Sequence, residues 1–237
     1  MEVTPLGDSA VIIRVADNFD NAREHALEQV LTAQRCLIAA KIPGVIEVAP
    51  AYTTVALFYD PQVVVDAGAP VENVVGWLSQ RIRDALSKSG QASTRPFQSS
   101  VIEIPVCYDR EFGFDLAEVA QRASLSTDDV IAAHSGAEYR VHCIGFTGGF
   151  PFLGGLPREL ATPRRETPRK EIPVGSVGIG GRQTGIYPIK SPGGWNIIGR
   201  TPSRLFDPQK NPPALLRVGD GVRFRAIDRQ EFERLTS

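Results

Sequence analysis

Residues 145–202 hold more than half of the chain's 22 glycines and eight of its 18 prolines. This density of glycine and proline excludes a continuous helix. A flexible linker would not carry the large aromatic residues of the same stretch, which are Phe146, Phe150, Phe152, Tyr187 and Trp195. Two interpretations remain open: ordered loops that shape a surface for an anionic or planar ligand, or a β-rich domain that simply needs many turns.

Size, charge and cysteine content limit the class of protein. The 237 residues suffice for one large domain or two small ones, each with a real core. A net charge of −1 gives no overall attraction for nucleic acid or an anionic membrane, so we expect neither as a partner. We also expect no secretory signal and no membrane span, because long apolar runs are missing. Three widely spaced cysteines predict reduced thiols and a cytoplasmic protein, and only three histidines predict no metal site.

The first 90 residues alternate strand and helix patterns. Residues 10–15 are typical of a strand, and Asn21 with Glu24 is typical of a capping box that begins a helix. A second amphipathic helix is expected from Pro70 onward. These patterns predict a small α/β sandwich domain over residues 1–90, with its helices on one face of the sheet.

A second domain is predicted over residues 97–237. The polar stretch 88–100 favours a link between the two domains. Helices are expected after Asp115 and Ser126, and many short strands with glycine turns follow, which is typical of a barrel or sandwich. The predicted fold class is therefore α+β.

Limited proteolysis tests the predicted link. We expect the first cleavage near residues 88–100, because this polar stretch has few side chains to bury and its backbone should be accessible. Mass spectrometry of the early fragments gives the result. An intact fragment spanning residues 60–130, with cleavage elsewhere, would refute the boundary.

Motifs for nucleotide binding and nucleophilic catalysis are weak. The run GSVGIGG at 175–181 does not match G-x-G-x-x-G and precedes a strand pattern, and no P-loop motif occurs. Ser176 lacks the spacing of a nucleophile elbow. His142 and Cys143 are strand neighbours that point to opposite faces, and we expect His134 to be a capping or surface residue. The catalytic residues are unknown, and the chain is best interpreted as one member of a complex whose chemistry a partner completes.

Two segments suggest a ligand surface. Arg164 and Arg169 each follow a Thr-Pro pair, and an arginine fork suits a carboxylate or phosphate, although a solvated loop is the alternative. The segment 187–195 could form a small anion nest from its glycine amides, or a tight hairpin with Trp195 filling the core. The predicted substrate-binding residues are Arg164, Arg169, Gln183, Tyr187, Lys190, Gly193, Gly194 and Trp195.

Longer motifs resemble one family over nearly the whole chain. These motifs are PLGDSA near the start, the stretch from PVCYD to GFTGGFPFLGGLP, QTGIYPIKSPGGWNIIGRTP, and VGDGVRF near the end. Together they resemble the family of 5-oxoprolinase B subunits, also called the KipI or allophanate-hydrolase-subunit-1 family, which corresponds to the first half of a urea-carboxylase-type carboxyltransferase domain. The family usually has Pro where Gly148 stands and commonly Tyr where Phe152 stands, so we expect a looser turn into the loop and the loss of one hydroxyl. If that hydroxyl contacts the ligand in relatives, the ligand of this chain would differ.

The resemblance implies a small N-terminal α/β sandwich followed by a C-terminal cyclophilin-like β-barrel. It also implies action with the A and C subunits of 5-oxoprolinase, which together open 5-oxo-L-proline to L-glutamate with ATP hydrolysis. ATP would be used by the complex, and the resemblance does not identify the polypeptide that binds it. A planar lactam bearing a carboxylate would suit arginines and glycine-lined amides.

Two alternatives belong to other functional classes. Relatives of the KipI type inhibit a sensor histidine kinase, and carboxyltransferase-like relatives act on a urea-type substrate with biotin. The chain has no Ala-Met-Lys-Met biotin-attachment motif, since Met1 is its only methionine, but a separate carrier would serve.

Overall fold

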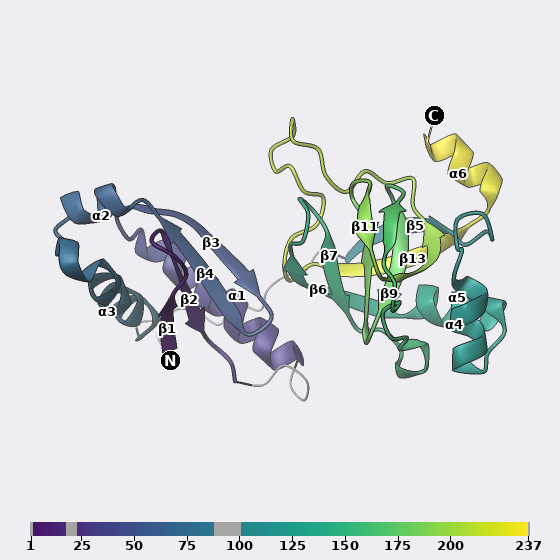
Figure 1. Cartoon of the computed structure of the whole chain (residues 1–237), viewed down its shortest axis with the longest axis horizontal. Coiled ribbons are helices and arrows are strands. Elements are labelled where there is room, and N and C mark those ends of the chain that lie inside the picture. Colours follow the sequence, from purple (N-terminus) through teal and green to yellow (C-terminus); the bar gives the residue numbers. More distant parts are fainter. Residues whose placement is uncertain (1, 18–22, 88–100, 237) are drawn as a thin grey trace. The chain divides into compact units, whose positions relative to one another are not determined.

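The computed structural model describes residues 2–17, 23–87 and 101–236. The chain divides into two compact units, Met1–Gln98 and Ser99–Ser237, shown in Figure 1. The predicted link at 88–100 and the Asn21 end of the predicted capping box lie outside the described residues. None of the helices in the described ranges is long and apolar enough to cross a membrane.

The first unit is an antiparallel sheet covered by helices. Its four strands lie in the order β1-β2-β4-β3, namely β1 (Glu2–Pro5), β2 (Ala10–Arg14), β4 (Thr54–Tyr59) and β3 (Val45–Ala51). The helical elements are α1 (Arg23–Ala40), α2 (Pro61–Asp66), η1 (Val71–Asn73) and α3 (Val74–Ser87). Val55 and Leu57 of β4 share one core cluster with Leu37 of α1 and Ile82 of α3, so the helices and one face of the sheet bury the same apolar surface. The predicted sandwich is confirmed.

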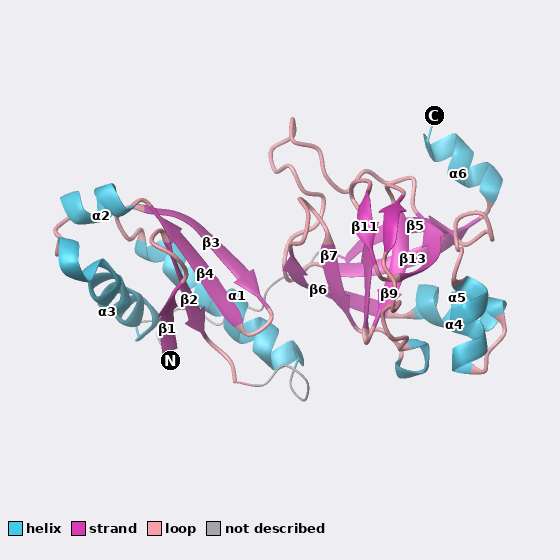
Figure 2. Ribbon diagram, viewed as in Figure 1, coloured by secondary structure: helices cyan, strands magenta, loops and turns pink. Residues whose placement is uncertain are grey.

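The second unit is a closed barrel of seven strands (Figure 2). Its order is β10-β7-β6-β13-β5-β12-β9, where the strands are β5 (Val101–Cys107), β6 (Glu138–Ile144), β7 (Pro151–Gly154), β9 (Ser176–Gly180), β10 (Gln183–Ile186), β12 (Asn196–Arg200) and β13 (Gly221–Ile227). Only β13 and β5 pair in parallel among the described strands. Closure of the sheet removes the exposed edges that an open sheet would present.

Smaller elements surround the barrel. They are the helices α4 (Leu116–Ala123), α5 (Thr127–Gly136) and α6 (Arg229–Thr236), the short turn η3 (Arg158–Leu160), and a two-stranded ribbon of β8 (Arg169–Ile172) and β11 (Ser191–Gly193). A capping box begins α5, in which the Ser126 hydroxyl and the Asp129 carboxylate bond each other's backbone amides. The α+β fold class, a sandwich followed by a β-barrel, is confirmed.

The barrel core contains a buried hydrogen-bonded chain. His134 of α5 is fully buried, with Nδ1 2.8 Å from the Tyr108 hydroxyl and Nε2 3.0 Å from Thr184 Oγ1. Thr184 donates to the carbonyl of Gly178 at 3.1 Å. Because a carbonyl only accepts, Thr184 must accept from Nε2–H, and Nδ1 therefore accepts from Tyr108.

The expectation that His134 lies at the surface or caps a helix is wrong. Its helix α5 contacts β13, and the imidazole stacks on Phe224 with centroids 4.5 Å apart. A helix that faces a barrel wall buries its inward side chains whatever their polarity, provided that each polar atom finds a partner. Burial lowers the pKa of His134 from 6.5 to about 3.

Acidification is expected to destabilise the second unit through His134. The folded state keeps this histidine neutral down to about pH 3, whereas the unfolded chain takes up a proton below its ordinary pKa. The stabilisation is therefore complete above pH 6.5 and falls as pH drops from 6.5 towards 3, by up to about 1.4 kcal/mol per pH unit. Urea midpoints between about pH 5 and pH 8 measure this dependence.

Tryptophan fluorescence can report on the second unit alone, because the chain has two tryptophans, one in each unit. In a Trp77→Phe background the signal comes from Trp195. His134→Gln keeps an amide donor for Thr184 but has no titrating group. The urea midpoint of this variant should therefore depend less steeply on pH than the midpoint of the parent protein. Equal pH dependence in both proteins would contradict the assignment to His134.

Candidate functional site

The Trp195 ring lies against the outer face of the barrel wall. Val177 and Ile179 of β9 belong to the barrel core, whereas the alternate residues Gly178 and Gly180 face Trp195. A Cβ on Gly180 would lie 2.6 Å from ring atoms of Trp195, so only glycine permits this contact. The glycines of this strand therefore make room for an aromatic ring.

Trp195 is the centre of an aromatic cluster. Its ring is edge-on to Phe150, with centroids 5.4 Å apart, and to Phe152 at 5.8 Å. Tyr187 joins the cluster through Phe150 at 5.0 Å, and its hydroxyl lies against Gly193 of the ribbon. Trp195 and Tyr187 are both buried, so the sequence alternative in which Trp195 fills a core describes the ring correctly.

Arg164 covers this cluster from the solvent side. Its side chain is exposed, and its guanidinium carbon lies 5.8 Å from the centroid of the Trp195 ring, within the range of a cation–π contact. Burial raises the pKa of Tyr187, and the charges of Arg164 and Arg169 partly offset this effect. The two arginines thus lie close enough to the cluster for their charge to act on its only hydroxyl.

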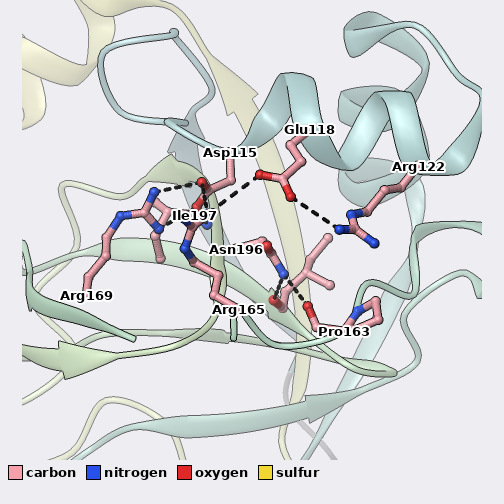
Figure 3. A network of polar contacts seen from close by, with 9 residues as sticks. Asp115, Glu118, Arg122, Pro163, Arg165, Arg169, Asn196 and Ile197 are labelled. Atoms are coloured by element: carbon pink, nitrogen blue, oxygen red, sulfur yellow. Dashed lines mark hydrogen bonds and ion pairs between the residues drawn. The ribbon is translucent and has the colours of Figure 1, made fainter. Parts of the chain in front are cut away.

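Asp115 is a buried carboxylate bound by two arginines (Figure 3). Arg169 donates from both terminal nitrogens, at 2.7 Å to each carboxylate oxygen, and Arg165 donates to Oδ1 at 2.9 Å. The amide of Ile197 donates to Oδ2 at 2.7 Å, while the amide of Asp115 donates to the carbonyl of Ile197 at 2.8 Å. The start of α4 is thereby fixed to strand β12.

The segment that precedes β8 is held at several further points. Thr162 pairs with Gly181, and the amide of Arg165 donates to the carbonyl of Gly194 at 2.8 Å. Asn196 donates to the carbonyl of Pro163 at 2.9 Å. The basic segment is therefore an ordered part of the unit rather than a loop surrounded only by solvent.

Glu118 and Arg122 of α4 form the outer edge of the polar network. Arg165 lies 3.6 Å from Glu118, and Arg122 lies 3.5 Å from the same carboxylate. Both side chains of the α4 pair are about half exposed, so we expect little stability from these contacts.

The structure brings most of the predicted substrate-binding residues together. The aromatic cluster brings together Tyr187, Trp195, Gly193 and Arg164. Arg169 pairs with Gly193 across the ribbon. The carbonyl of Gly194 accepts from the amide of Arg165. Gln183 begins β10 opposite Gly180, next to the Trp195 contact. Lys190 lies apart from this group, where it pairs with Glu171 at 2.7 Å on the exposed side of the ribbon.

The roles of the two predicted arginines differ. Arg169 has the expected bidentate geometry, but its partner is Asp115 of the same chain, so a ligand contact for Arg169 stays a prediction. Sequence reasoning misses Asp115 as a partner because it lies 50 or more residues from both arginines and appears only as a residue at a helix start. The prediction that α4 begins at this aspartate is correct, although its side chain makes no capping bond.

The two cysteine thiols of the second unit are poorly activated. Burial raises the pKa of Cys143 to about 11 and raises that of Cys107, so both thiols are protonated near neutrality. The glycine-rich run 175–181 is mainly the buried strand β9 and not a phosphate-binding loop. No group of three His, Cys, Asp or Glu side chains in the described ranges is placed to hold a metal ion.

Comparison with known proteins identifies the family. Residues 1–216 match the family described as carboxyltransferase domain, subdomain C and D. The chain belongs to this family. It is 42% identical to the B subunit of 5-oxoprolinase from Bacillus subtilis over 98% of this chain and 95% of that protein. It is 41% identical to the corresponding B subunit from Escherichia coli O157:H7 over 92% of this chain and 93% of that protein.

Solved structures agree with this assignment. The crystal structure of TTHA0988 is 36% identical, with a TM-score of 0.73, and the match spans 92% of this chain but only 40% of the TTHA0988 chain. The urea amidolyase of Kluyveromyces lactis has a TM-score of 0.72 at 17% identity over 98% of this chain and 15% of its own, which shows the shared fold.

Removal of the buried carboxylate is expected to destabilise the second unit. Asp115→Ala leaves two arginines and one amide without their acceptor, so we expect a loss of about 3 kcal/mol in the free energy of unfolding. Glu118→Ala on the same helix is the matched control and should cost less than about 1 kcal/mol. Urea denaturation followed by Trp195 fluorescence in the Trp77→Phe background compares them. Equal losses in the two variants would contradict the central role of Asp115.

Proposed function

We propose that this chain is the B subunit of an ATP-dependent 5-oxoprolinase complex, which converts 5-oxo-L-proline to L-glutamate. The observation that carries the proposal is the 42% identity to such a B subunit over nearly the full length of both chains. A match of that extent covers both units, so the sandwich and the barrel are shared together. We further propose that its partners are the A and C subunits of 5-oxoprolinase and that the complex is cytoplasmic, in keeping with three free cysteines.

The poorly activated groups of the described residues support a dependence on partners. The thiols of Cys107 and Cys143 are held protonated, and the neutral imidazole of His134 is enclosed in the barrel core. An enclosed imidazole cannot reach a substrate, and a protonated thiol is a poor nucleophile. We therefore infer that the isolated chain has negligible activity.

ATP use is proposed for the complex. Opening a lactam is uphill near neutrality, so coupling to ATP hydrolysis supplies the driving force. The glycine-rich run 175–181 of this chain does not fit ATP phosphates, because residues 176–180 form a fully buried wall strand whose amides pair with neighbouring strands. This run therefore offers no site for the phosphates of ATP.

Arg164 is the residue best placed to bind the carboxylate of 5-oxoproline. Asp115 accepts from one nitrogen of Arg165 and from both terminal nitrogens of Arg169, whereas Arg164 contacts the Trp195 ring. A guanidinium that lies over an aromatic ring is held in place while its donors still face solvent. The flat lactam would lie beside the Arg164 guanidinium, near the half-buried Gln183 and above the buried rings of Trp195 and Tyr187.

Reconstitution tests the function. The purified chain is assayed alone and with the A and C subunits from the same organism, and ATP-dependent release of glutamate from 5-oxoproline is measured. We expect turnover only in the complete mixture. Robust turnover by the isolated chain would refute its dependence on partners. If the mixture instead carboxylates urea with a biotin carrier, or the chain inhibits a sensor kinase, one of the alternative functions holds.

Arg164→Ala tests the ligand surface in the same assay. The loss of a charged hydrogen-bond donor is expected to cost about 1.5–3 kcal/mol of transition-state stabilisation. This cost corresponds to a kcat/KM that is roughly 10–150-fold lower, mainly through a higher KM. Arg164→Lys should restore only part of this loss, since lysine offers a point charge in place of a fork.

A suitable control arginine lies in the first unit. Arg35 on α1 is exposed, and its guanidinium donates to Thr32 one turn earlier on the same helix, so Arg35→Ala should leave kcat/KM unchanged. Arg229 is unsuitable as a control because it bonds Glu111 and Glu233 and lies over Phe112. A folded Arg164→Ala variant with wild-type kinetics would show that Arg164 is an ordinary solvated side chain.

A further inference from the structure

Among the phenylalanines of the described ranges that are exposed, Phe146 is the most exposed. Its side chain is 63% exposed, whereas Phe114 and Phe58 are 44% and 37% exposed. The ring contacts Phe150 edge-on with centroids 5.7 Å apart, but Phe150 is already buried by Phe152, Tyr187 and Trp195. Phe146 is therefore not needed to complete the cluster.

The backbone holds Phe146 in a strained conformation. Its φ is +66°, in the left-handed region that favours glycine and that bulky residues rarely adopt. The loop is fixed on both sides: the amide of Gly145 donates to the carbonyl of Phe150, and the amide of Phe150 donates to the carbonyl of Thr147. Such strain costs free energy, persists only where the surrounding structure imposes it, and is concentrated at functional sites. The result is a hydrogen-bonded loop that presents an aromatic side chain to solvent.

A second exposed segment adjoins this loop. Phe206 lies against Gly148 and Gly149, and the neighbouring Leu205 carbonyl accepts from the amide of Leu215. In Figure 1 the yellow-green segment between β12 and β13 extends away from the barrel. Leu215 is 44% exposed, so a second apolar side chain lies on this segment.

The charges around these apolar side chains are predominantly positive. Arg204, Lys210 and Arg217 lie on the segment 203–217 with exposed side chains, against the single acidic residue Asp207. A complementary surface would present an apolar pocket bordered by carboxylates. Rigid aromatic anchors with a charged border are typical of protein–protein contacts, because an ordered ring loses little conformational entropy on binding.

We propose that the loop 145–150 and the segment 203–217 form the docking surface for a companion polypeptide, with Phe146 inserted into an apolar pocket bordered by carboxylates. This inference rests on the proposed function, because a B subunit implies other subunits. The match to TTHA0988 spans only 40% of that chain, so in a related protein this two-unit module is covalently joined to further polypeptide. A separate companion chain would occupy the equivalent place here.

Calorimetric titration of the full chain with the purified A subunit, and separately with the purified C subunit, tests the surface. Phe146→Asn removes the ring and keeps a residue that tolerates left-handed backbone, so the variant should fold. We expect about 30-fold weaker binding of the companion that the wild type binds. Lys210→Glu should slow association most at low salt. Phe58→Thr, which removes an exposed aromatic from β4 of the first unit, should bind normally.

A stability readout separates docking from a structural role. Relief of the strained backbone should leave the urea midpoint of Phe146→Asn unchanged or raised while binding weakens. Normal binding by this variant, or a loss of binding accompanied by a lower midpoint, would overturn the proposal.

Two further outcomes distinguish this proposal from others. If the wild-type chain binds neither companion and the mixture is inactive, the proposed function fails and the docking surface fails with it. If Phe146→Asn binds its companion normally but raises the KM for 5-oxoproline, or if it abolishes self-association of the wild type, then Phe146 contacts substrate or a second copy and the companion surface is refuted.

Discussion

The close contact between Trp195 and the bare backbone of β9 sets the arrangement of the outer barrel face. Any side chain at Gly180 would displace the ring, and the ring in turn supports Phe150, Phe152 and the guanidinium of Arg164. Glycine in a strand normally weakens it, because it adds chain entropy and leaves nothing to pack. Here the cost is offset by burial of the largest apolar side chain, which contributes through the area it removes from water.

The contacts of Asp115 distinguish Arg165 and Arg169 from the neighbouring Arg164. An ionised carboxylate has about four acceptor positions, and the four donors on Asp115 come from Arg165, both terminal nitrogens of Arg169, and the Ile197 amide. Because all four positions accept a hydrogen bond from the protein, the carboxylate regains the hydrogen bonds to water that it loses on burial. The same bonds give Arg165 and Arg169 an internal partner, which leaves Arg164 facing solvent above Trp195.

Local patterns in the sequence predict the elements well, but they do not predict long-range polar partners. The strand pattern at residues 10–15, the helix after Asp115 and the helix after Ser126 are short-range signals, and the structure has all three elements. The pairing of Asp115 with Arg169 spans 54 residues and depends on barrel closure, which no local pattern encodes. The prediction for His134 fails for the same reason, because its burial follows from the contact between α5 and the barrel wall. The dense glycines are plain in the sequence, but composition cannot separate the approach of a ligand from the approach of an aromatic ring.

Phe146 and Arg164 lie at opposite ends of one chain of aromatic contacts. Phe146 touches Phe150, Phe150 touches Trp195, and Trp195 supports Arg164, with each step between 5.4 and 5.8 Å. Close-packed rings of this kind shift together rather than independently. The proposed companion contact at Phe146 and the proposed ligand contact at Arg164 would therefore lie on one continuous set of packed rings. Such continuity would give a physical reason for the proposed ligand surface to depend on the proposed partner.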